Sequence, residues 1–234
     1  MIPAEDMAGC RAAHERLRAT LASLTDEQAR RPSLLPGWTV AHVLSHLARN
    51  ADSHVHLFAE AGRGQVGVQY PGGDQQRDRD IEVGSARTAA DLVADVEAST
   101  QRLEEAWDAT PPDVWRDGRA YTRAGPGLPL RELPFSRWRE VEVHHADLGL
   151  AYRVDDWSEG FVDGELERRV ALLAGRLPPG VAVRLEPSDG GTSVTVPEGS
   201  GDPAVVAAPR RRLVAWLLGR ADVPGAPELR PWSP

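Results

Sequence analysis

The spacing of apolar residues between positions 40 and 61 constrains the fold more strongly than any other feature of the sequence. Apolar side chains recur there every three or four residues, which is the period of an α-helix that buries one face. Thr39 stands immediately before this pattern and can cap the helix N-terminus. The sequence therefore predicts a long helix that must pack against other elements. Its apolar face comprises Val40, Val43, Leu44, Leu47, Ala51, Val55 and Phe58.

Three further segments have a similar pattern, over residues 4–24, 88–108 and about 132–151. Long segments separate them, and two of these, 62–78 and 117–130, are rich in glycine and polar residues and are predicted to be loops. Four helices with long connections predict a helical bundle. The core of such a bundle is a usual place for sites built from facing helices.

The pattern changes after "YRVDDW", and we place a domain boundary near residue 154. A helix is predicted over residues 158–177, followed by two alternating strands around the turn "PSDGG". "AVVAA" is a predicted third strand and "RRRLVAWLLGR" a closing helix, whereas the proline-rich tail favours no regular structure. The expected fold class is mixed, α plus α/β. A four-helix bundle occupies residues 1–154, and a smaller α+β domain occupies residues 155–234.

Composition excludes several functions. The net charge of -8 disfavours binding to nucleic acid or to an anionic membrane. All 27 basic residues are arginine, so a lysine Schiff base and a P-loop lysine are excluded. Cys10 is the only cysteine, which excludes an intrachain disulfide. No stretch approaches the roughly 18 consecutive apolar residues of a membrane span, so we expect a cytoplasmic protein. The bias toward Arg, Ala, Gly and Pro indicates a GC-rich genome and suggests an actinobacterium.

The segment "RWREVEVHHADLGLAY" carries the most specific chemistry. On a helix, Glu140 and His144 differ by only about 40° in direction, and Asp147 lies within about 20° of Glu140. A carboxylate and an imidazole on a partly apolar face must be satisfied if they are buried. A divalent metal such as zinc would satisfy both. The alternative is a solvated Glu–His pair, which is common on helices.

A zinc site needs a third protein ligand, and the helix over residues 40–61 offers four histidines: His42, His46, His54 and His56. His54 lies nearest the apolar face, whereas His46 flanks it together with Asn50. A lone histidine near an apolar face is more often a hydrogen-bonded core residue than a ligand. Periodicity does not choose among the four.

Two motifs together identify a family. "LLPGWTVAHVLSHLARNADS" followed by "RWREVEVHHADLG" resembles the mycothiol-dependent maleylpyruvate isomerase family, whose first domain is a DinB-like four-helix bundle. The resemblance extends to "RDRDIEVGS", "LEEAWDATPPDVW" and "WLLGRADVPGAPELRPW", so it covers nearly the whole chain in the family's domain order.

The resemblance implies a set of site residues. The family's three zinc ligands fall on His46, Glu140 and His144, and a water or a thiol completes the coordination sphere. An arginine that the family needs for isomerase activity falls on Arg220, whose alternative role is a cation at a helix C-terminus. A second arginine, in the loop before the "GS" pair, falls on Arg77, with Arg79 two residues away as the alternative.

The resemblance also implies the activity and the partners. The cofactors are zinc or another divalent metal and mycothiol, a low-molecular-weight thiol, and the substrate is the small anion maleylpyruvate of gentisate breakdown. The thiolate adds to the cis double bond, rotation follows, and elimination leaves fumarylpyruvate. The alternatives are a mycothiol S-transferase that detoxifies electrophiles and a non-catalytic DinB-like module that senses thiols or metals. We expect a monomer.

Other residues near the inferred site have weaker assignments. Asp147 shares a face with His144 and is predicted to orient that imidazole, because metal-bound histidines usually donate their second N–H to such a partner. Asn50 and His54 are predicted to contact the thiol cofactor. His145 points away from His144 and is predicted to be structural. Cys10 has no activating neighbour in the sequence and is not expected to be the nucleophile.

Overall fold

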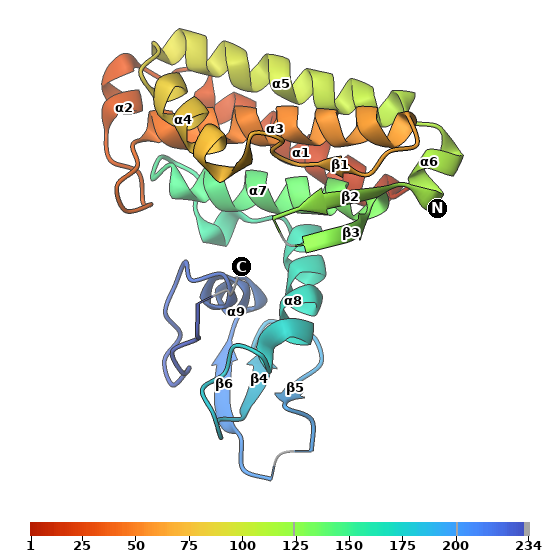
Figure 1. Cartoon of the computed structure of the whole chain (residues 1–234). Coiled ribbons are helices and arrows are strands. Elements are labelled where there is room, and N and C mark those ends of the chain that lie inside the picture. Colours follow the sequence, from red (N-terminus) through yellow and green to blue (C-terminus); the bar gives the residue numbers. More distant parts are fainter. Residues whose placement is uncertain (124, 200, 232–234) are drawn as a thin grey trace. The chain divides into compact units, whose positions relative to one another are not determined.

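Four long helices dominate the first of the two units into which the chain divides, Met1–Arg153 and Val154–Pro234. The computed structural model describes residues 1–123, 125–199 and 201–231. In Figure 1, α5 and α7 lie on opposite sides of α3, and α3 packs against both of them. Helix α1 packs against α5 and α7, which closes the bundle. The four helices are α1 (Ala4–Leu21), α3 (Val40–Gly62), α5 (Ala89–Ala109) and α7 (Leu133–Asp147).

Helix α3 is the central element of this unit. It begins with a capping box in which the Thr39 side chain accepts a hydrogen bond from the His42 backbone and the His42 ring bonds back to the Thr39 backbone. Most of its residues are buried, including Leu44, Leu47 and Leu57, each without exposed surface. The predicted long helix is therefore confirmed, and its apolar face forms the core of the bundle.

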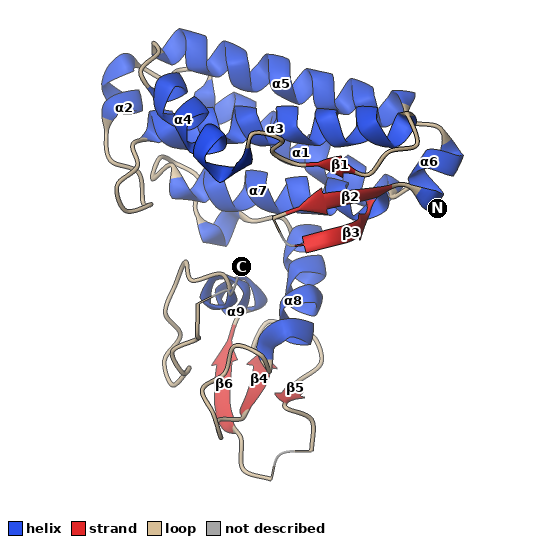
Figure 2. Cartoon of the chain, in the orientation of Figure 1, coloured by secondary structure: helices blue, strands red, loops and turns tan. Residues whose placement is uncertain are grey.

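Shorter elements cover the bundle (Figure 2). They are α2 (Asp26–Arg30), α4 (Gly73–Ser85), α6 (Pro112–Asp117), the 3₁₀ turn η1 (Leu130–Glu132) and the strands β1 (Gly67–Val68), β2 (Arg119–Thr122) and β3 (Gly125–Pro129). The strands form a small sheet in the order β1-β2-β3. Gly67 pairs in parallel with Ala120, and Arg119 pairs antiparallel with Pro129.

The prediction that residues 62–78 form a loop is partly wrong, because α4 begins at Gly73 within this segment. Helix α4 buries only Ile81 and Gly84, so its sequence lacks the apolar periodicity that reveals a helix. A Cβ atom at Gly84 would lie 2.1 Å from the Ser45 Oγ atom on α3. Glycine at this position therefore allows α4 to lie directly against α3.

Two other boundaries differ from the prediction. The segment 117–130, predicted to be a loop, contains β2 and β3, whose glycines and prolines conceal the strand pattern. Helix α7 ends at Asp147 rather than near residue 151, because Gly149 adopts a φ of +65° that ends the helix.

The second unit combines helices with a small mixed sheet, which confirms the predicted α+β character of this part. The sheet has the order β5-β4-β6, and it lies with α8 and α9 around a shared core that includes Leu173, Val183 and Trp216. Val183 pairs antiparallel with Val196 and in parallel with Ala204. The elements are η2 (Val154–Asp156), α8 (Glu159–Leu173), β4 (Val183–Pro187), β5 (Val194–Val196), β6 (Ala204–Ala208) and α9 (Arg210–Leu217).

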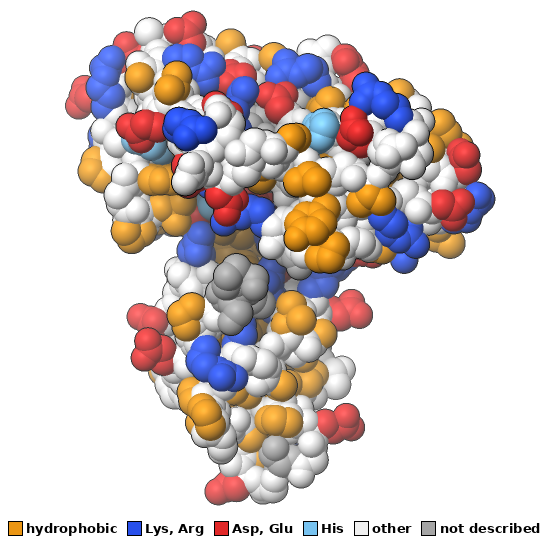
Figure 3. Space-filling model, in the orientation of Figure 1, with side chains coloured by type: hydrophobic (Ala, Val, Ile, Leu, Met, Phe, Trp, Pro, Cys, Tyr) orange, Lys and Arg blue, Asp and Glu red, His pale blue; other side chains and the backbone are white. Residues whose placement is uncertain are grey.

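The tail has no regular structure over residues 221–231, as predicted, whereas the closing helix α9 ends at Leu217 rather than at residue 220. Residues 232–234 lie outside the described part of the chain. Acidic and basic side chains are interspersed on the visible face of each unit (Figure 3). Among the residues that the structure describes, no helix combines the length and apolar character needed to cross a bilayer.

One glycine sets the separation of α1 and α7. A Cβ atom at Gly9 would lie 2.2 Å from the Cη2 atom of Trp138, which is only 6% exposed. The indole ring therefore packs directly on the backbone of α1. This contact fixes the distance between α1 and the helix that carries Glu140 and His144.

We expect Gly9→Ala to destabilise the first unit by about 1–3 kcal/mol, because the added methyl group overpacks the α1–α7 contact. Gly62→Ala is the matched control, since no atom lies within 4 Å of the Cβ position and alanine favours helix. Urea unfolding followed by tryptophan fluorescence measures both. Equal midpoints for the two variants would contradict the packing account.

Candidate metal centre

Three metal-ligating side chains meet where α3 faces α7. His46 comes from α3, and Glu140 and His144 come from successive turns of α7. The His46 Nε2 atom lies 2.8 Å from Glu140 Oε2, and the His144 Nε2 atom lies 3.5 Å from the same oxygen. One donor atom from each residue lies within 4.8 Å of the others. The packing of two helices thus brings together residues that are 94 positions apart in sequence.

The three side chains differ in exposure. The His46 side chain is 6% exposed and that of His144 is 16% exposed, whereas that of Glu140 is 29% exposed. The carboxylate therefore forms the solvent-facing side of the cluster.

The protonation of the cluster follows from burial and pairing. Burial lowers the pKa of His46 to about 4, although its hydrogen bond to Glu140 opposes this shift. Burial alone would raise the pKa of Glu140, but hydrogen bonds from His144 and His46 hold it well below its usual range. His144 is also buried, yet its bonds to Asp147 and Glu140 raise its pKa to about 9. At neutral pH the metal-free cluster thus pairs a neutral imidazole, a carboxylate and an imidazolium.

Side chains around the cluster hold the two imidazoles in place. The His144 Nδ1 atom lies 2.8 Å from Asp147 Oδ2, which is the contact that an orienting role for Asp147 requires. On the other ligand, Arg77 Nη2 donates to His46 Nδ1 at 3.2 Å, and the Trp38 ring lies 5.7 Å from the His46 ring. Both imidazoles therefore turn their Nε2 atoms toward Glu140.

The donor set fits a divalent metal of borderline hardness. Two imidazole nitrogens and one carboxylate oxygen are the ligands of many catalytic zinc sites, which keep a fourth position for water or substrate. The shared Glu140 oxygen and the convergence of both Nε2 atoms on it are the geometry that such an ion would stabilise. The residues present are therefore suited to hold the ion.

Two polar residues that the sequence associates with the thiol cofactor lie on α3 beyond His46. Asn50 is 3% exposed and His54 is 1% exposed. Successive steps of four residues place both on the same side of α3 as His46. The Asn50 Oδ1 atom accepts a hydrogen bond from Arg137 Nη1 at 2.8 Å. Both residues thus lie inside the bundle.

The structure accounts for two histidines outside the cluster. His42 belongs to the helix cap, and its Nε2 atom lies 3.1 Å from Glu82 Oε2. His145 is 1% exposed, with its ring stacked on Tyr152 at 3.8 Å and its Nε2 atom 2.8 Å from Thr20 Oγ1. These contacts occupy the two imidazoles in structural roles, as predicted for His145.

The two arginines considered before the "GS" pair have different surroundings. Both lie on α4 rather than in the predicted loop. The side chain of Arg77 is 12% exposed; it contacts His46 and lies over the Tyr70 ring, with its Cζ atom 5.7 Å from the ring centre. Arg79 donates to Gln76 on the exposed side of α4. The structure thus brings Arg77, and not Arg79, to the cluster.

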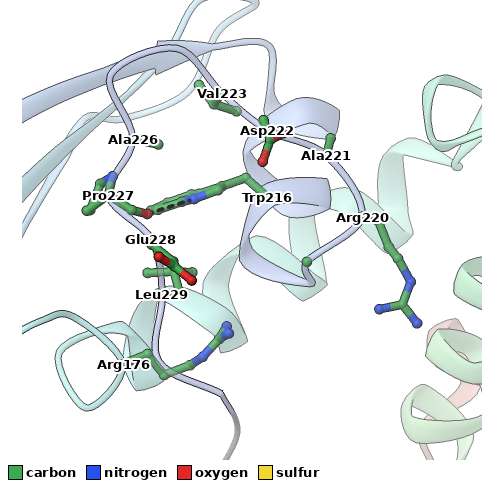
Figure 4. Close-up of a pocket in the computed structure, with 11 residues that line it drawn as sticks. Arg176, Trp216, Arg220, Ala221, Asp222, Val223, Ala226, Pro227, Glu228 and Leu229 are labelled. Carbon is green, nitrogen blue, oxygen red and sulfur yellow. Dashed lines mark hydrogen bonds between the residues drawn. The ribbon is translucent and has the colours of Figure 1, made fainter. Parts of the chain in front are cut away.

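Arg220 lies in the second unit, in the turn directly after the last residue of α9, Leu217. Its Nη1 atom donates to the Leu218 carbonyl oxygen at 3.0 Å. It lines a pocket of about 710 Å³, which also contains Arg176, Trp216 and the acidic Asp222 (Figure 4). Such a pocket is large enough for a small organic ligand.

Arg137 is a site-adjacent residue that the sequence arguments missed. It is fully buried, and it donates to the Leu47 carbonyl oxygen and to Asn50. Seven residues before His144, it projects from α7 in nearly the same direction, which is the one available signal. A charged residue on a helix face that already carries two candidate ligands could have been added to the set.

Cys10 is fully buried near Arg137 and His14. Its Sγ atom lies 3.8 Å from His14 Nε2, and burial raises the pKa of the thiol well above its ordinary value. A protonated, inaccessible thiol is a poor nucleophile. This agrees with the expectation that Cys10 is not the nucleophile.

A helical bundle that brings two histidines and a glutamate together from facing helices belongs to a fold class in which sites are commonly built in the core from such side chains. Within this class, residues 10–149 match the family described as the mycothiol maleylpyruvate isomerase N-terminal domain. The chain belongs to this family, and the resemblance recognised in the sequence is confirmed.

Two solved structures extend the similarity to nearly the whole chain. One is the crystal structure of the mycothiol-dependent maleylpyruvate isomerase, and the other is that of its variant with one histidine replaced by alanine. Each is 25% identical, with a TM-score of 0.85, and the match covers 99% of this chain and 97% of the other. A comparison with curated proteins found no match.

We expect the purified protein to bind about one divalent metal ion per chain and His46→Ala to lose most of it, because one of three ligands is removed. His56→Ala is the control, since it changes a half-buried histidine of the same helix outside the cluster. Metal analysis after dialysis measures both. Equal metal content in the two variants would contradict the site.

The metal-free protein provides a second prediction. The pKa of His144 rises from 6.5 to about 9 on folding, so its protonated form stabilises the fold. This contribution is fully present below about pH 6.5 and is lost as the pH rises through about 9. His144→Gln should therefore cost on the order of 1–3 kcal/mol more at about pH 6 than at about pH 9.5. Urea unfolding of chelator-treated protein measures this, and a pH-independent difference would contradict it.

Proposed function

We propose that this protein is a mycothiol-dependent isomerase that converts maleylpyruvate to fumarylpyruvate at a divalent metal site. One observation carries the proposal, namely the match over 99% of the chain to a mycothiol-dependent maleylpyruvate isomerase at a TM-score of 0.85. The family match and the cluster of His46, Glu140 and His144 support it independently.

His46, Glu140 and His144 hold the metal, for which we propose zinc. When bound, the ion lowers the pKa of a coordinated thiol and so supplies a thiolate at neutral pH. Asp147 accepts a hydrogen bond from the His144 Nδ1–H group and fixes the ring so that Nε2 is free to coordinate. The solvent-facing side of the cluster, at Glu140, admits the thiol.

The chemistry that the thiol supplies is reversible addition. A C–S bond forms at one carbon of the cis double bond, and the π electrons of the double bond shift so that the conjugated carbonyl oxygen becomes negative. Rotation about the resulting single bond follows, and return of the electron pair breaks the C–S bond and releases the thiolate and the trans isomer. No oxidant, reductant or net proton is required. The protein must therefore hold two carboxylates and stabilise one oxygen that transiently becomes negative.

Arg77 is placed to hold a carboxylate next to the metal. In the structure it donates to His46 Nδ1. An imidazole that binds a metal through Nε2 keeps its proton on Nδ1, where it cannot accept a hydrogen bond. With a metal on Nε2 this hydrogen bond would be lost, and the Arg77 guanidinium, whose planar fork suits a carboxylate, would be available to the incoming anion.

Arg220 is the second proposed carboxylate-binding arginine. A guanidinium can hold a carboxylate through two parallel hydrogen bonds, and in Figure 4 the Arg220 side chain extends away from the other residues that line the pocket. A protein with a net charge of -8 needs such local cations to attract a dianionic substrate. Asn50 and His54 complete the proposed site on the inner side of the bundle, where they face the bound thiol and substrate.

Neither a mycothiol S-transferase nor a non-catalytic module is favoured by the comparisons, because both solved structures are of an isomerase. The two enzymes would share the metal ligands and the thiol. Their substrates differ, and arginines such as Arg77 and Arg220 suit a dianion rather than a neutral electrophile.

The decisive experiment combines the metal-loaded protein, mycothiol and maleylpyruvate and follows the ultraviolet spectrum. We expect conversion to fumarylpyruvate only when all three are present. Omission of mycothiol is the internal control. Conjugation of a generic electrophile without any isomerisation would replace this proposal with the transferase.

Arg220→Ala should lower kcat/KM for maleylpyruvate by about 100-fold or more, because a charge-assisted hydrogen bond to the substrate is lost. Metal content should not change, since Arg220 is not among the metal-binding side chains. Arg184→Ala is the matched control, because Arg184 lies on the exposed face of β4 and pairs with Glu186. Unchanged turnover in Arg220→Ala would mean that this arginine serves only as a cation at the C-terminal end of α9.

A further inference from the structure

Several buried polar atoms of the described residues have no hydrogen-bond partner, and two of them are nitrogens on the helices α3 and α7, which also carry the metal ligands. They are Nη2 of Arg137 and Nδ1 of His54. Arg137 is 0% exposed and His54 is 1% exposed, so bulk water does not satisfy them. Buried polar groups are almost always paired, and an unpaired group costs about 1–3 kcal/mol. Two such groups in one place require a physical reason.

Hydrogen bonds hold the guanidinium of Arg137 in place and leave one of its nitrogens without a partner. Its Nη1 atom donates to the Leu47 carbonyl oxygen and to Asn50 Oδ1, both at 2.8 Å. Its Nε atom donates to His14 Nε2 at 3.2 Å. These bonds tie α7 to α3 and α1, so that Nη2 has a fixed position. A donor that is held in this way is pre-organised for a ligand.

His54 lies on the same side of the bundle. It is two helical turns beyond His46 on α3, and Arg137 is one turn before Glu140 on α7. Burial, followed by the charge of Arg137, lowers the pKa of His54 to about 3, while Glu140 opposes the shift. The ring is therefore neutral at physiological pH. Arg137 also binds Asn50, which is one helical turn before His54 on α3, so the two unpaired nitrogens belong to the same α3–α7 contact as the metal ligands.

The chemistry of these two nitrogen atoms determines which ligand they can bind. Nη2 of a guanidinium is only a donor, and a neutral imidazole can present an N–H group at Nδ1. A fixed cation and a neutral donor in a buried site favour an oxygen that carries negative charge. A thiol or a neutral hydroxyl group would leave the buried positive charge uncompensated.

We propose that Arg137 Nη2 and His54 Nδ1 form a donor pair that binds an anionic oxygen of the substrate beside the metal. This inference rests on the proposed isomerase function; it adds Arg137 to the proposed substrate-binding residues and gives His54 a specific ligand. The oxygen comes either from a substrate carboxylate or from the conjugated carbonyl group that becomes negative when the thiolate adds. A carboxylate is bound before the reaction, and the carbonyl oxygen gains its charge only during it, so KM and kcat separate the two sources.

The primary test is His54→Leu, which replaces the ring with an apolar side chain of similar volume. The thermal midpoint should be unchanged or higher, because an unpaired buried nitrogen is removed. Metal content should also be unchanged. If the donor pair binds the carbonyl oxygen, kcat should fall about 100-fold; if it binds a carboxylate, KM should rise at least tenfold. His56→Leu is the control on the same helix and should keep wild-type kinetics. Kinetic parameters of His54→Leu within about threefold of wild type overturn the proposal and assign the space to an ordered water.

A second pair of variants applies even if His54→Leu does not fold. The side-chain amide of Asn reaches the position of an imidazole Nδ1 atom, whereas that of Gln reaches the position of Nε2. His54→Asn should therefore retain kinetics within about tenfold of wild type, and His54→Gln should show the loss expected for His54→Leu. Equal kinetics in the Asn and Gln variants overturn the proposal.

Failure of the proposed function is a different result, namely a wild-type protein without mycothiol-dependent turnover. In that event the binding of maleate, a dianion with the cis double bond of the substrate, is measured instead of turnover. The donor pair predicts that maleate raises the thermal midpoint of the metal-loaded wild type and of His56→Leu but not of His54→Leu. Equal shifts in all three proteins, including no shift, overturn the proposal.

Discussion

The contact between α3 and α7 is the interaction on which the rest of this structure depends. It places the Nε2 atom of His46 2.8 Å from the Glu140 carboxylate and brings His144 against the same oxygen. Ionisable groups rarely occur in a bundle core, because taking a charge out of water costs several kcal/mol unless it is paired. Here a carboxylate between two imidazoles solves that problem in the metal-free protein. The same three side chains would be the ligands of a divalent metal.

Polar side chains extend well beyond this cluster into the bundle. Glu142 is 1% exposed and pairs with Arg16, the Trp138 indole N–H group and the Tyr152 hydroxyl group. His14 joins Arg137 to Glu104. These contacts pair Glu142 and His14, two buried ionisable side chains outside the metal cluster. The unpaired nitrogens of Arg137 and His54 lie on the side that faces the cluster, where a substrate can supply the missing partner.

Sequence patterns predicted the elements whose burial is periodic and missed those whose burial is not. The face of α3 repeats every three or four residues, so its bounds and its Thr39 cap could be predicted closely. Helix α4 buries only Ile81 and Gly84, and the close approach of Gly84 to Ser45 on α3 has no hydrophobic signature. This omission mattered for the site, because α4 is the element that carries Arg77 to His46.

The site was predictable in kind but not in detail. The spacing of Glu140 and His144 indicated a possible metal pair, yet the choice of His46 among the histidines of α3 came from the family resemblance. Helical spacing alone does not choose among the four histidines, although His54 lies nearest the apolar face. Which face of α3 meets α7 depends on tertiary packing, and no local pattern records it. Arg137 was overlooked for a related reason, since an arginine on an amphipathic helix usually reaches solvent.

Replacement of the native metal by cobalt(II) tests the central claim most directly, because cobalt in this donor set absorbs visible light and a sulfur ligand adds an intense near-ultraviolet band. We predict that the wild-type protein binds one cobalt ion with a visible spectrum typical of low coordination number. Mycothiol should then produce the sulfur-to-cobalt band, and His46→Ala should abolish both signals. A visible spectrum that is the same in His46→Ala, or one that mycothiol leaves unchanged, would contradict the account of a metal held by His46, Glu140 and His144 that activates a thiol.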